Sequence, residues 1–219
     1  MSQKDVFLSS EADAWYERNL KAVKKIDFSI DPVSLAVLEL VTTFPPEMQA
    51  RRLRVLEVGC GEGRRLEWLA AKLNLDVYGI EPSALAVDKA RARGITAERG
   101  TADDLPFDDA TFDVLIFGFC LYLCDRQDLF RVAQEANRVL KPDSWLVIND
   151  FYAPHPIKRE YHHKPGVYSY KMDYRRLFTW HPAYTCFAHK VTFHGRTEFT
   201  DDSQEWMATS VMRKRMESQ

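Results

Sequence analysis

The chain has 219 residues, of which 46% are hydrophobic and 28% are charged, the usual balance of a globular protein with one sizeable core. Its 30 basic and 32 acidic residues leave a formal net charge of -2, so the surface as a whole does not attract a polyanion and we expect no nucleic-acid partner. The N-terminal stretch MSQKDVFLSSEADAW lacks the apolar segment of a signal peptide, and no stretch approaches the roughly 18 apolar residues of a membrane span. We therefore expect a single-domain cytoplasmic protein without a membrane partner.

The spacing of the cysteines also favours the cytoplasm. They form no C-x-x-C pair, which argues against a disulfide framework and favours free thiols in a reducing environment. A nucleophilic role for the closely spaced Cys120 and Cys124 lacks an activating histidine nearby in the sequence, so we expect both to pack as small apolar side chains. The other two cysteines are Cys60 and Cys186.

Two helices are expected before the first strand. The first begins near Glu11, where Ser9 or Ser10 can provide the N-cap. The second begins at the pair Asp31–Pro32, because aspartate caps helices and proline fits the first helical position. The pair Pro45–Pro46 ends it.

Short apolar runs then alternate with helical patterns. Strands are expected at 55–58, 77–80, 96–99, 112–117 and 145–148, and helices at 66–73, 82–93 and 127–140. Such alternation predicts a parallel sheet with helices on both faces. After an aromatic, His-rich and Pro-rich stretch without clean periodicity, strands at 184–193 and 205–211 are separated by turn residues and predict a hairpin. The expected fold is therefore α/β: a Rossmann-like, doubly wound, mostly parallel seven-stranded sheet with an antiparallel C-terminal hairpin.

The stretch RVLEVGCGEGRRLEWLA places three alternating glycines where the first strand meets a helix. In an open parallel sheet such a turn lies at the ligand-binding end, and its glycines let a ligand approach the backbone. A dinucleotide site needs G-x-G-x-x-G, but Arg64 stands where the third glycine is required. Glu81, which ends the second strand, can accept hydrogen bonds from both hydroxyls of a ribose, so the ligand is expected to be adenosine-like.

Four motifs in order, LEVGCGEG, GIEPS, GTADDLPFDDATFDVLIF and ANRVLKPDSWLVIND, resemble those of the class I S-adenosylmethionine-dependent methyltransferases, most closely their type 11 small-molecule branch. The resemblance spans residues 54–150, and it implies S-adenosyl-L-methionine as cofactor and S-adenosyl-L-homocysteine as product. It also implies a set of cofactor-binding residues: Glu57, Gly59, Cys60, Gly61, Glu81, Pro82, Ala102, Asp103, Phe117, Gly118 and Phe119. The chain departs from the family at Thr101, where aspartate is common, and at KPDS in place of KPGG.

The resemblance implies methyl transfer by in-line displacement to an O or N nucleophile of a small molecule, sugar-like or aromatic. It divides the chain into a helical N-terminal cap (1–50), a cofactor-binding core (51–150), an acceptor-covering insert (151–182) and a C-terminal strand hairpin (183–217). The catalytic candidates are His155, Tyr161, His162 and His163, any of which can handle a proton. Further candidates for acceptor contacts are Tyr168, Tyr170, Asp173, Tyr174 and His181.

Other interpretations remain open at this point. The histidines have no metal-ligand spacing, so no metal site is expected. Trp15 and Tyr16 are either the buried face of the first helix or, with Arg18, part of a cap over the cofactor carboxylate. The alternatives to a methyltransferase are a non-catalytic S-adenosylmethionine-binding subunit and a nucleotide-dependent oxidoreductase. The sequence carries no signal for oligomeric state.

Overall fold

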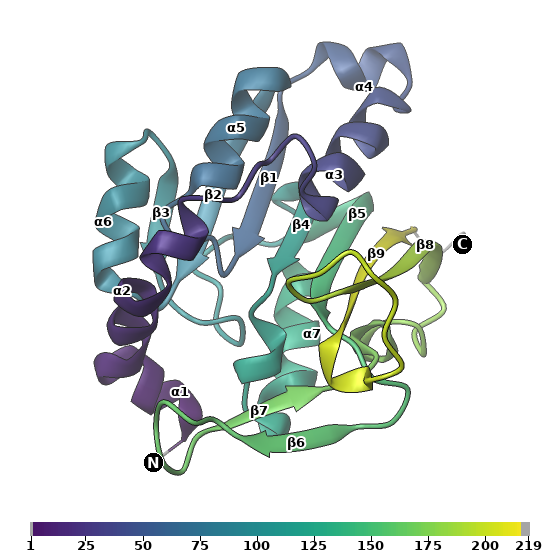
Figure 1. Ribbon diagram of the computed structural model, residues 1–219. Helices are drawn as coiled ribbons and strands as arrows, with labels where there is room; N and C mark the ends of the chain where they lie inside the picture. The colour runs from purple at the N-terminus through teal and green to yellow at the C-terminus, as the bar shows by residue number, and fades with distance from the viewer. Residues whose placement is uncertain (1, 216–219) are drawn as a thin grey trace.

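The computed structural model describes residues 2–215 and confirms the expected α/β sheet (Figure 1). Seven strands follow the order β3-β2-β1-β4-β5-β9-β8, in which β9 is antiparallel to both of its neighbours, β5 and β8, and the other six strands run in one direction. The strands of this sheet are β1 (Leu53–Val58), β2 (Leu75–Glu81), β3 (Thr96–Arg99), β4 (Phe112–Gly118), β5 (Leu140–Phe151), β8 (Tyr184–Phe193) and β9 (Trp206–Lys214). The order reverses at β1 and β4, so the carboxyl ends of these two strands mark the switch point of the sheet.

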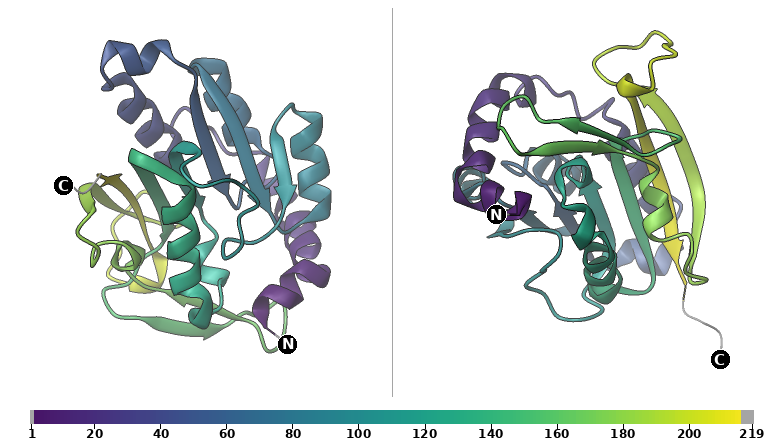
Figure 2. Two further views of the ribbon diagram at one scale, coloured as in Figure 1. Left: turned by 180° about the vertical axis from the view of Figure 1, so that it is seen from behind. Right: turned by 90° about the horizontal axis from the view of Figure 1, so that it is seen from below.

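Helices cover both faces of the sheet (Figure 2). The helices are α1 (Gln3–Val6), α2 (Ala12–Val23), α3 (Pro32–Thr42), α4 (Pro46–Ala50), α5 (Arg64–Lys72), α6 (Ala84–Ala92) and α7 (Leu129–Val139). The β4 strand shows how the two layers form, because its side chains alternate between faces. Val114 and Ile116 pack with α3, α5 and α6, whereas Leu115 and Phe117 pack with α7. The strand is buried on both sides, as its continuous apolar run predicted.

The N-terminal helix begins earlier than predicted. The Ser2 hydroxyl caps α1 by accepting from the Asp5 amide, and a π-helical segment, η1 (Phe7–Glu11), joins α1 to α2. The expected cap at Ser9 or Ser10 is wrong, because both lie inside this continuous helical run, and the Ser9 hydroxyl donates to a carbonyl one turn back. The second expected start is confirmed, since Asp31 caps α3.

The β5 strand is longer than the predicted 145–148 because α7 leads directly into it. Within its first part, Asp143 adopts φ 55°, the left-handed conformation that the glycine of the family motif would take more easily. The departure at KPDS therefore stays a local feature of the backbone.

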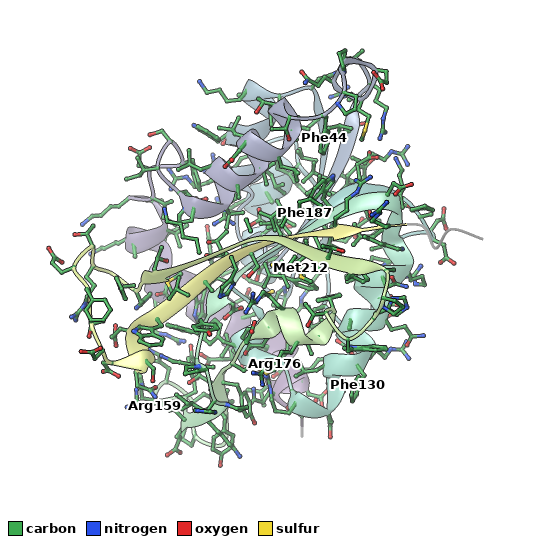
Figure 3. All side chains as sticks on the ribbon, turned by 90° about the vertical axis from the view of Figure 1, so that its right-hand side faces the viewer. Phe44, Phe130, Arg159, Arg176, Phe187 and Met212 are labelled. Atoms are coloured by element: carbon green, nitrogen blue, oxygen red, sulfur yellow. The ribbon has the colours of Figure 1, made fainter. Side chains whose placement is uncertain are left out.

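The segment 151–182 forms a small hairpin of its own. It consists of β6 (Ile157–Glu160), β7 (Tyr168–Lys171) and a 3-10 turn, η4 (Tyr174–Leu177). Beside it, β8 and β9 run side by side, with Phe187 exposed on β8 and Met212 buried on β9 (Figure 3). Within residues 2–215, no helix is both long and apolar enough to cross a membrane.

A buried carboxylate at the start of β4 connects several segments at the end of the sheet where β1 and β4 begin. Asp113 accepts hydrogen bonds from the Arg51 guanidinium (2.6 Å), the Arg54 amide (2.8 Å) and the Lys141 ammonium (3.0 Å). Burial opposes the ionisation of Asp113, yet these donors hold its pKa below the ordinary value of 3.8.

We predict that Asp113→Asn lowers the free energy of unfolding at pH 7 by about 2 kcal/mol, because an amide cannot accept from three donors as a carboxylate does. Since the folded-state pKa is depressed, this difference is full above the unfolded pKa and shrinks as the pH falls through the folded pKa. Urea unfolding at several pH values measures it. Asp109→Asn, at an ion-paired side chain that is 79% exposed, is the control and should cost less than about 0.5 kcal/mol. Equal effects of the two substitutions would contradict the assignment.

Candidate functional site

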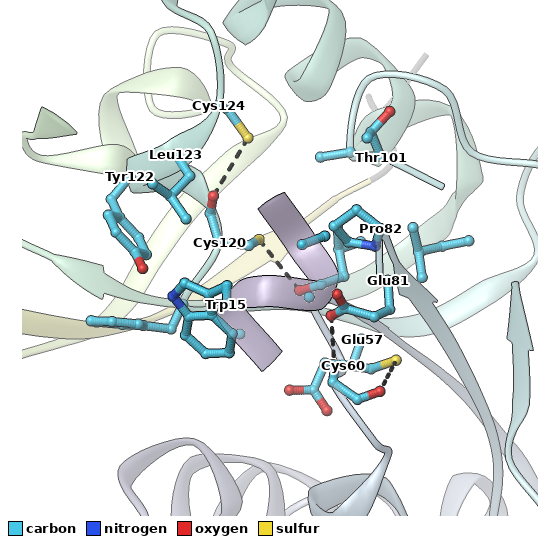
Figure 4. Close-up of a pocket in the computed structure, with 18 of the residues that line it drawn as sticks. Trp15, Glu57, Cys60, Glu81, Pro82, Thr101, Cys120, Tyr122, Leu123 and Cys124 are labelled. Carbon is cyan, nitrogen blue, oxygen red and sulfur yellow. Dashed lines mark hydrogen bonds between the residues drawn. The ribbon is translucent and has the colours of Figure 1, made fainter. Parts of the chain in front are cut away.

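A cavity of about 400 Å³ lies at the carboxyl ends of β1, β2 and β4 (Figure 4). Its wall combines the glycine turn after β1, the end of β2, the loop after β4, the N-terminal helices and the end of the β8–β9 hairpin. This is the position at which open α/β sheets bind ligands, and the volume lies in the range of small-molecule sites.

The glycine turn supplies a bare backbone to the cavity. Gly59, Gly61 and Gly63 have φ values of 79°, 54° and 73°, in the left-handed region that side-chain-bearing residues avoid. Gly63 forms the N-cap of α5, so the first amides of this helix are directed toward the turn. The backbone of the turn is thereby open to a ligand.

A buried ionic chain runs beside the turn. The Arg65 guanidinium donates to Glu57 Oε1 and, at 3.0 Å, to Asp31 Oδ2, while Asp31 also caps α3. Burial raises the pKa of Glu57, and Arg65 partly offsets that rise. Glu57 Oε2 is buried in the cavity wall and has no hydrogen-bond partner among the described residues. An unsatisfied carboxylate oxygen of this kind is a site for a donor supplied by a ligand.

Glu81 lies across the turn from Glu57. Its Oε2 accepts from the Gly61 amide and its Oε1 from the Ser83 amide, both at 3.0 Å. Burial raises the pKa of Glu81 to about 7, although the two amides act in the opposite direction. The carboxylate is thus held in one orientation and titrates near neutral pH.

A further acidic side chain borders the cavity beyond β3. Asp103 Oδ2 pairs with the Lys4 ammonium at 2.6 Å. Burial opposes the ionisation of Asp103, but hydrogen bonds from Lys4 and Thr101 hold its pKa below the ordinary value. Ala102 also lines the cavity here, whereas Asp104 only pairs with Thr101 in an isolated bridge.

The N-terminal helices cover the cavity. The Tyr16 hydroxyl donates to Glu62 Oε2 at 2.8 Å, and the Ser83 hydroxyl donates to Asp13 at 2.6 Å. Trp15 lies in the cavity wall (Figure 4). Arg18 does not line the cavity, and its guanidinium donates to Glu11 Oε1 and to the Tyr161 hydroxyl.

The loop after β4 and the C-terminal hairpin close the remaining side. Phe119 adopts φ 65°, uncommon for an aromatic residue, and lines the cavity with Tyr122. Asn149 from β5, His194 from the β8–β9 turn and Met207 from β9 complete this wall. Aromatic, amide and imidazole groups therefore gather in this wall of the cavity.

All the residues expected to bind cofactor line this cavity except Phe117, which is fully buried beneath it and packs against Phe178. In contrast, no described residue of 151–182 lines it. Instead, Tyr161 is buried against Phe7, and His163 packs edge-to-face on Tyr161.

The remaining candidates of this segment have other positions. Asp173 pairs with Arg175, and the Tyr174 hydroxyl donates to the Tyr170 carbonyl. The Tyr168 amide and carbonyl are bonded to the Gln3 side chain, and the His181 ring accepts from the Ala183 amide. His155 is exposed, and His162 stacks beside Tyr161. The expected cover from 151–182 is thus replaced by the N-terminal helices and the β8–β9 turn, and we carry none of these residues into a catalytic role.

Several residues of the site escaped the sequence analysis. Arg65 lies two residues after Gly63, in the first turn of α5. This position, at the ligand-binding end of the sheet, is the sequence signal that could have identified it. Lys4, Asn149 and His194 carry no local signal, because only the folded chain brings them to the cavity. The described residues contain no group of three or more His, Cys, Asp or Glu side chains arranged to hold a metal ion.

The central part of the sequence is similar to known methyltransferases. Residues 55–143 match a family model described as a methyltransferase domain. A fatty-acid O-methyltransferase of Mycolicibacterium smegmatis is 34% identical over 102 residues, which cover 44% of this chain and 36% of that protein. A 27-O-demethylrifamycin SV methyltransferase of Amycolatopsis mediterranei is 33% identical over 106 residues, covering 45% and 38%. The matched part is well under half the length of each of these curated relatives.

A solved structure extends the likeness to nearly the whole chain. It is the 1,6-didemethyltoxoflavin-N1-methyltransferase of Burkholderia thailandensis, crystallised with 1,6-didemethyltoxoflavin and S-adenosylhomocysteine. The TM-score is 0.71, with 97% of this chain and 89% of that chain covered at 14% identity. At this identity the comparison establishes the fold.

We predict that Gly118→Ala lowers the free energy of unfolding by about 2 kcal/mol, because its Cβ would overlap Glu57 Oε1 and press on the Arg65 guanidinium. Urea unfolding measures the change. Gly100→Ala is the matched control, since its Cβ would meet only Ile80 Cγ2 at 3.6 Å, an ordinary contact. If both variants were equally stable, the close packing of β4 on the Glu57 carboxylate would be refuted.

Proposed function

We propose that the chain is a class I S-adenosylmethionine-dependent methyltransferase, which transfers a methyl group from S-adenosylmethionine to an oxygen or nitrogen atom of a small molecule. The observation that carries this proposal is the buried, unpartnered Oε2 of Glu57 at the wall of the cavity. A carboxylate oxygen there matches a cationic donor, and the amino group of the cofactor's methionyl part is one.

The other described residues of the cavity fit the same cofactor. Gly59 and Gly61 present backbone where the methionyl and ribose parts would lie, without side chains to exclude them. Glu81 is held by two amides in an orientation that leaves its carboxylate available to ribose hydroxyls. Asp103 and the Ala102 backbone border the cavity where the adenine would be recognised.

When bound, the cofactor supplies an activated methyl group on a sulfonium, so the protein's main task is to place a nucleophile in line with it. The N-terminal helices contribute by covering the cavity through the Tyr16–Glu62 and Lys4–Asp103 contacts. Exclusion of water strengthens the electrostatic interactions inside and prevents wasteful hydrolysis. The acceptor would occupy the aromatic side of the cavity.

A small-molecule acceptor is favoured by the covered cavity and by the net charge of -2. The similar proteins include a fatty-acid O-methyltransferase, a 27-O-demethylrifamycin SV methyltransferase and a 1,6-didemethyltoxoflavin-N1-methyltransferase, and these names support an oxygen or nitrogen acceptor. The aromatic wall suits a ring better than a sugar, because flat faces stack on one another. An oxidoreductase is disfavoured, since Arg64 occupies the third glycine position of the dinucleotide motif.

We predict that calorimetry detects saturable binding of S-adenosylmethionine and of S-adenosylhomocysteine but not of NAD. Glu57→Gln should weaken the binding of S-adenosylmethionine about 10- to 100-fold, because the charge-assisted bond to the ligand amino group is lost. Glu67→Gln is the control, since its half-exposed carboxylate pairs with Arg93 on the outer side of α5. Equal affinities of the two variants, or binding of NAD alone, would contradict the proposal.

Turnover separates an enzyme from a binding subunit. Labelled S-adenosylmethionine incubated with a metabolite extract should yield S-adenosylhomocysteine and a labelled small molecule. Binding without any turnover would favour the non-catalytic alternative.

We also predict a pH dependence of S-adenosylhomocysteine binding that arises from Glu81. Its pKa of about 7 means that the carboxylate is mostly protonated at pH 6 and mostly ionised at pH 8. Only the ionised form accepts from both ribose hydroxyls, so the affinity should be about tenfold lower at pH 6 than at pH 8. Calorimetry across this range measures the effect. Glu81→Gln should bind weakly with a flat profile, and a flat profile in the native protein would refute the assignment.

A further inference from the structure

One wall of the cavity contains, apart from Phe119, no residue of the cofactor assignment. Phe119, Tyr122, Asn149, His194 and Met207 line it, from the loop after β4, the end of β5 and the β8–β9 hairpin. An inference about this wall depends on the proposed methyl transfer and specifies which acceptor the site takes.

The wall is built from flat rings. The rings of Phe119 and His194 are nearly parallel, with centroids 6.0 Å apart and an interplanar angle of 8°. Phe151 packs behind both, at 4.8 Å from Phe119 and 5.2 Å from His194, and Tyr122 meets Phe151 edge-on at 5.2 Å. Such a surface favours a planar ring over a flexible chain or a sugar.

A polar group in the same wall is fixed in orientation. The Thr209 hydroxyl donates to Asn149 Oδ1 at 2.8 Å, so the carbonyl side of this amide is already engaged. The NH₂ side of Asn149 remains as the donor for the cavity. A donor at this position can bind an oxygen of the acceptor and stabilise negative charge that develops on it.

His194 carries the imidazole of this wall, a side chain whose ring nitrogen can serve as a general base. Its Nδ1 faces the Glu205 carboxylate at 4.0 Å, which leaves Nε2 as the free nitrogen. Burial raises the pKa of the Tyr122 hydroxyl, so that group keeps its proton. Lys171 lies over Phe151, with its ammonium 3.9 Å from the ring centroid, and the Asp150 carboxylate accepts from the amides of Tyr122 and Phe151, so charged groups of both signs lie near this cluster. The His194 side chain is 54% exposed, so water can receive the proton afterwards.

We propose that His194 is the general base for a planar aromatic acceptor that carries a hydroxyl group, stacked against the Phe119 and His194 rings. Nε2 removes the hydroxyl proton, and the electron pair freed on the acceptor oxygen forms the bond to the methyl carbon. The pair of the breaking carbon–sulfur bond stays on sulfur, and His194 releases its proton to water. Glu205 acts as a positioning residue that stabilises the imidazolium, and the Asn149 amide binds the acceptor oxygen.

The test uses 4-nitrophenol, whose ionised form absorbs visible light, added to the full chain saturated with S-adenosylhomocysteine. The native protein should bind the probe saturably and raise the ratio of phenolate to phenol relative to free probe at the same pH. His194→Gln should lower that ratio for bound probe about tenfold. Glu205→Gln should lower it by a smaller factor, whereas Arg196→Gln, an exposed change in the same hairpin turn, should leave it unchanged.

The outcomes separate this inference from the proposed function. Calorimetry of S-adenosylhomocysteine is run on every variant without the probe, and binding there should be within about twofold of the native value because these substitutions leave Glu57 and Glu81 intact. If the native protein fails to bind S-adenosylhomocysteine, the proposed function itself is overturned. If it binds S-adenosylhomocysteine but not the phenol, or if His194→Gln keeps the native phenolate ratio, the role of His194 is overturned and the proposed function stands. With labelled S-adenosylmethionine, methylation of the same phenol should fall about 100-fold in His194→Gln.

Discussion

The Asp31–Arg65–Glu57 chain is the interaction on which the cofactor side of the molecule depends. It joins the start of α3, the start of α5 and the carboxyl end of β1 through one buried guanidinium. Removal of Arg65 would leave two carboxylates without a counter-charge in a low-dielectric interior, a change that costs far more free energy than an intact ion pair contributes. The absence of a side chain at Gly118 is a condition of this arrangement, because the backbone of β4 passes directly over the Glu57 carboxylate. Oε1 of Glu57 is bonded to Arg65, whereas Oε2 has no partner among the described residues.

The N-terminal helices are attached to the site through its acidic residues. Tyr16 binds Glu62, Lys4 binds Asp103, and Gln3 bonds to the carbonyls of Leu123 and Tyr168. The cover therefore spans the glycine turn at one end and the β6–β7 hairpin at the other. Segment 151–182 contributes to this architecture from outside, since it supports the cover and does not line the cavity. The Lys4–Asp103 pair, with Lys4 about one-third exposed, is among the weaker attachments of this cover.

The sequence predicted most of what local patterns determine. The strands of the parallel core, the Asp31 cap and the glycine turn follow from periodicity and from residues a few positions apart, and Glu81 follows from its place at the end of β2. The aromatic wall could not be predicted in this way. His194 reaches Phe119 only because β9 pairs with β5 and returns the hairpin turn to the switch point. The expectation that segment 151–182 lines the acceptor site was wrong for the same reason, namely that the contacts of this segment are distant in the sequence. Its tyrosines and histidines show no period because their partners, such as Gln3 and Phe7, lie at the other end of the chain.

The two sides of the cavity are held by buried carboxylates at the ends of strands, but by different means. Glu57 is fixed by a guanidinium, so its charge is compensated and one oxygen remains for a ligand. Asp150, at the end of β5, accepts from the amides of Leu121 and Phe151, both at 2.7 Å, and burial raises its pKa to about 7. It thereby fastens the loop that carries Phe119 and Tyr122 to the strand that carries Asn149. Every residue except proline has a backbone amide, so the hydrogen bonds that Asp150 accepts fix the path of the loop without requiring particular side chains in it. The donor side thus depends on particular residues, whereas the acceptor side depends on a backbone scaffold onto which different acceptor-binding side chains can be placed.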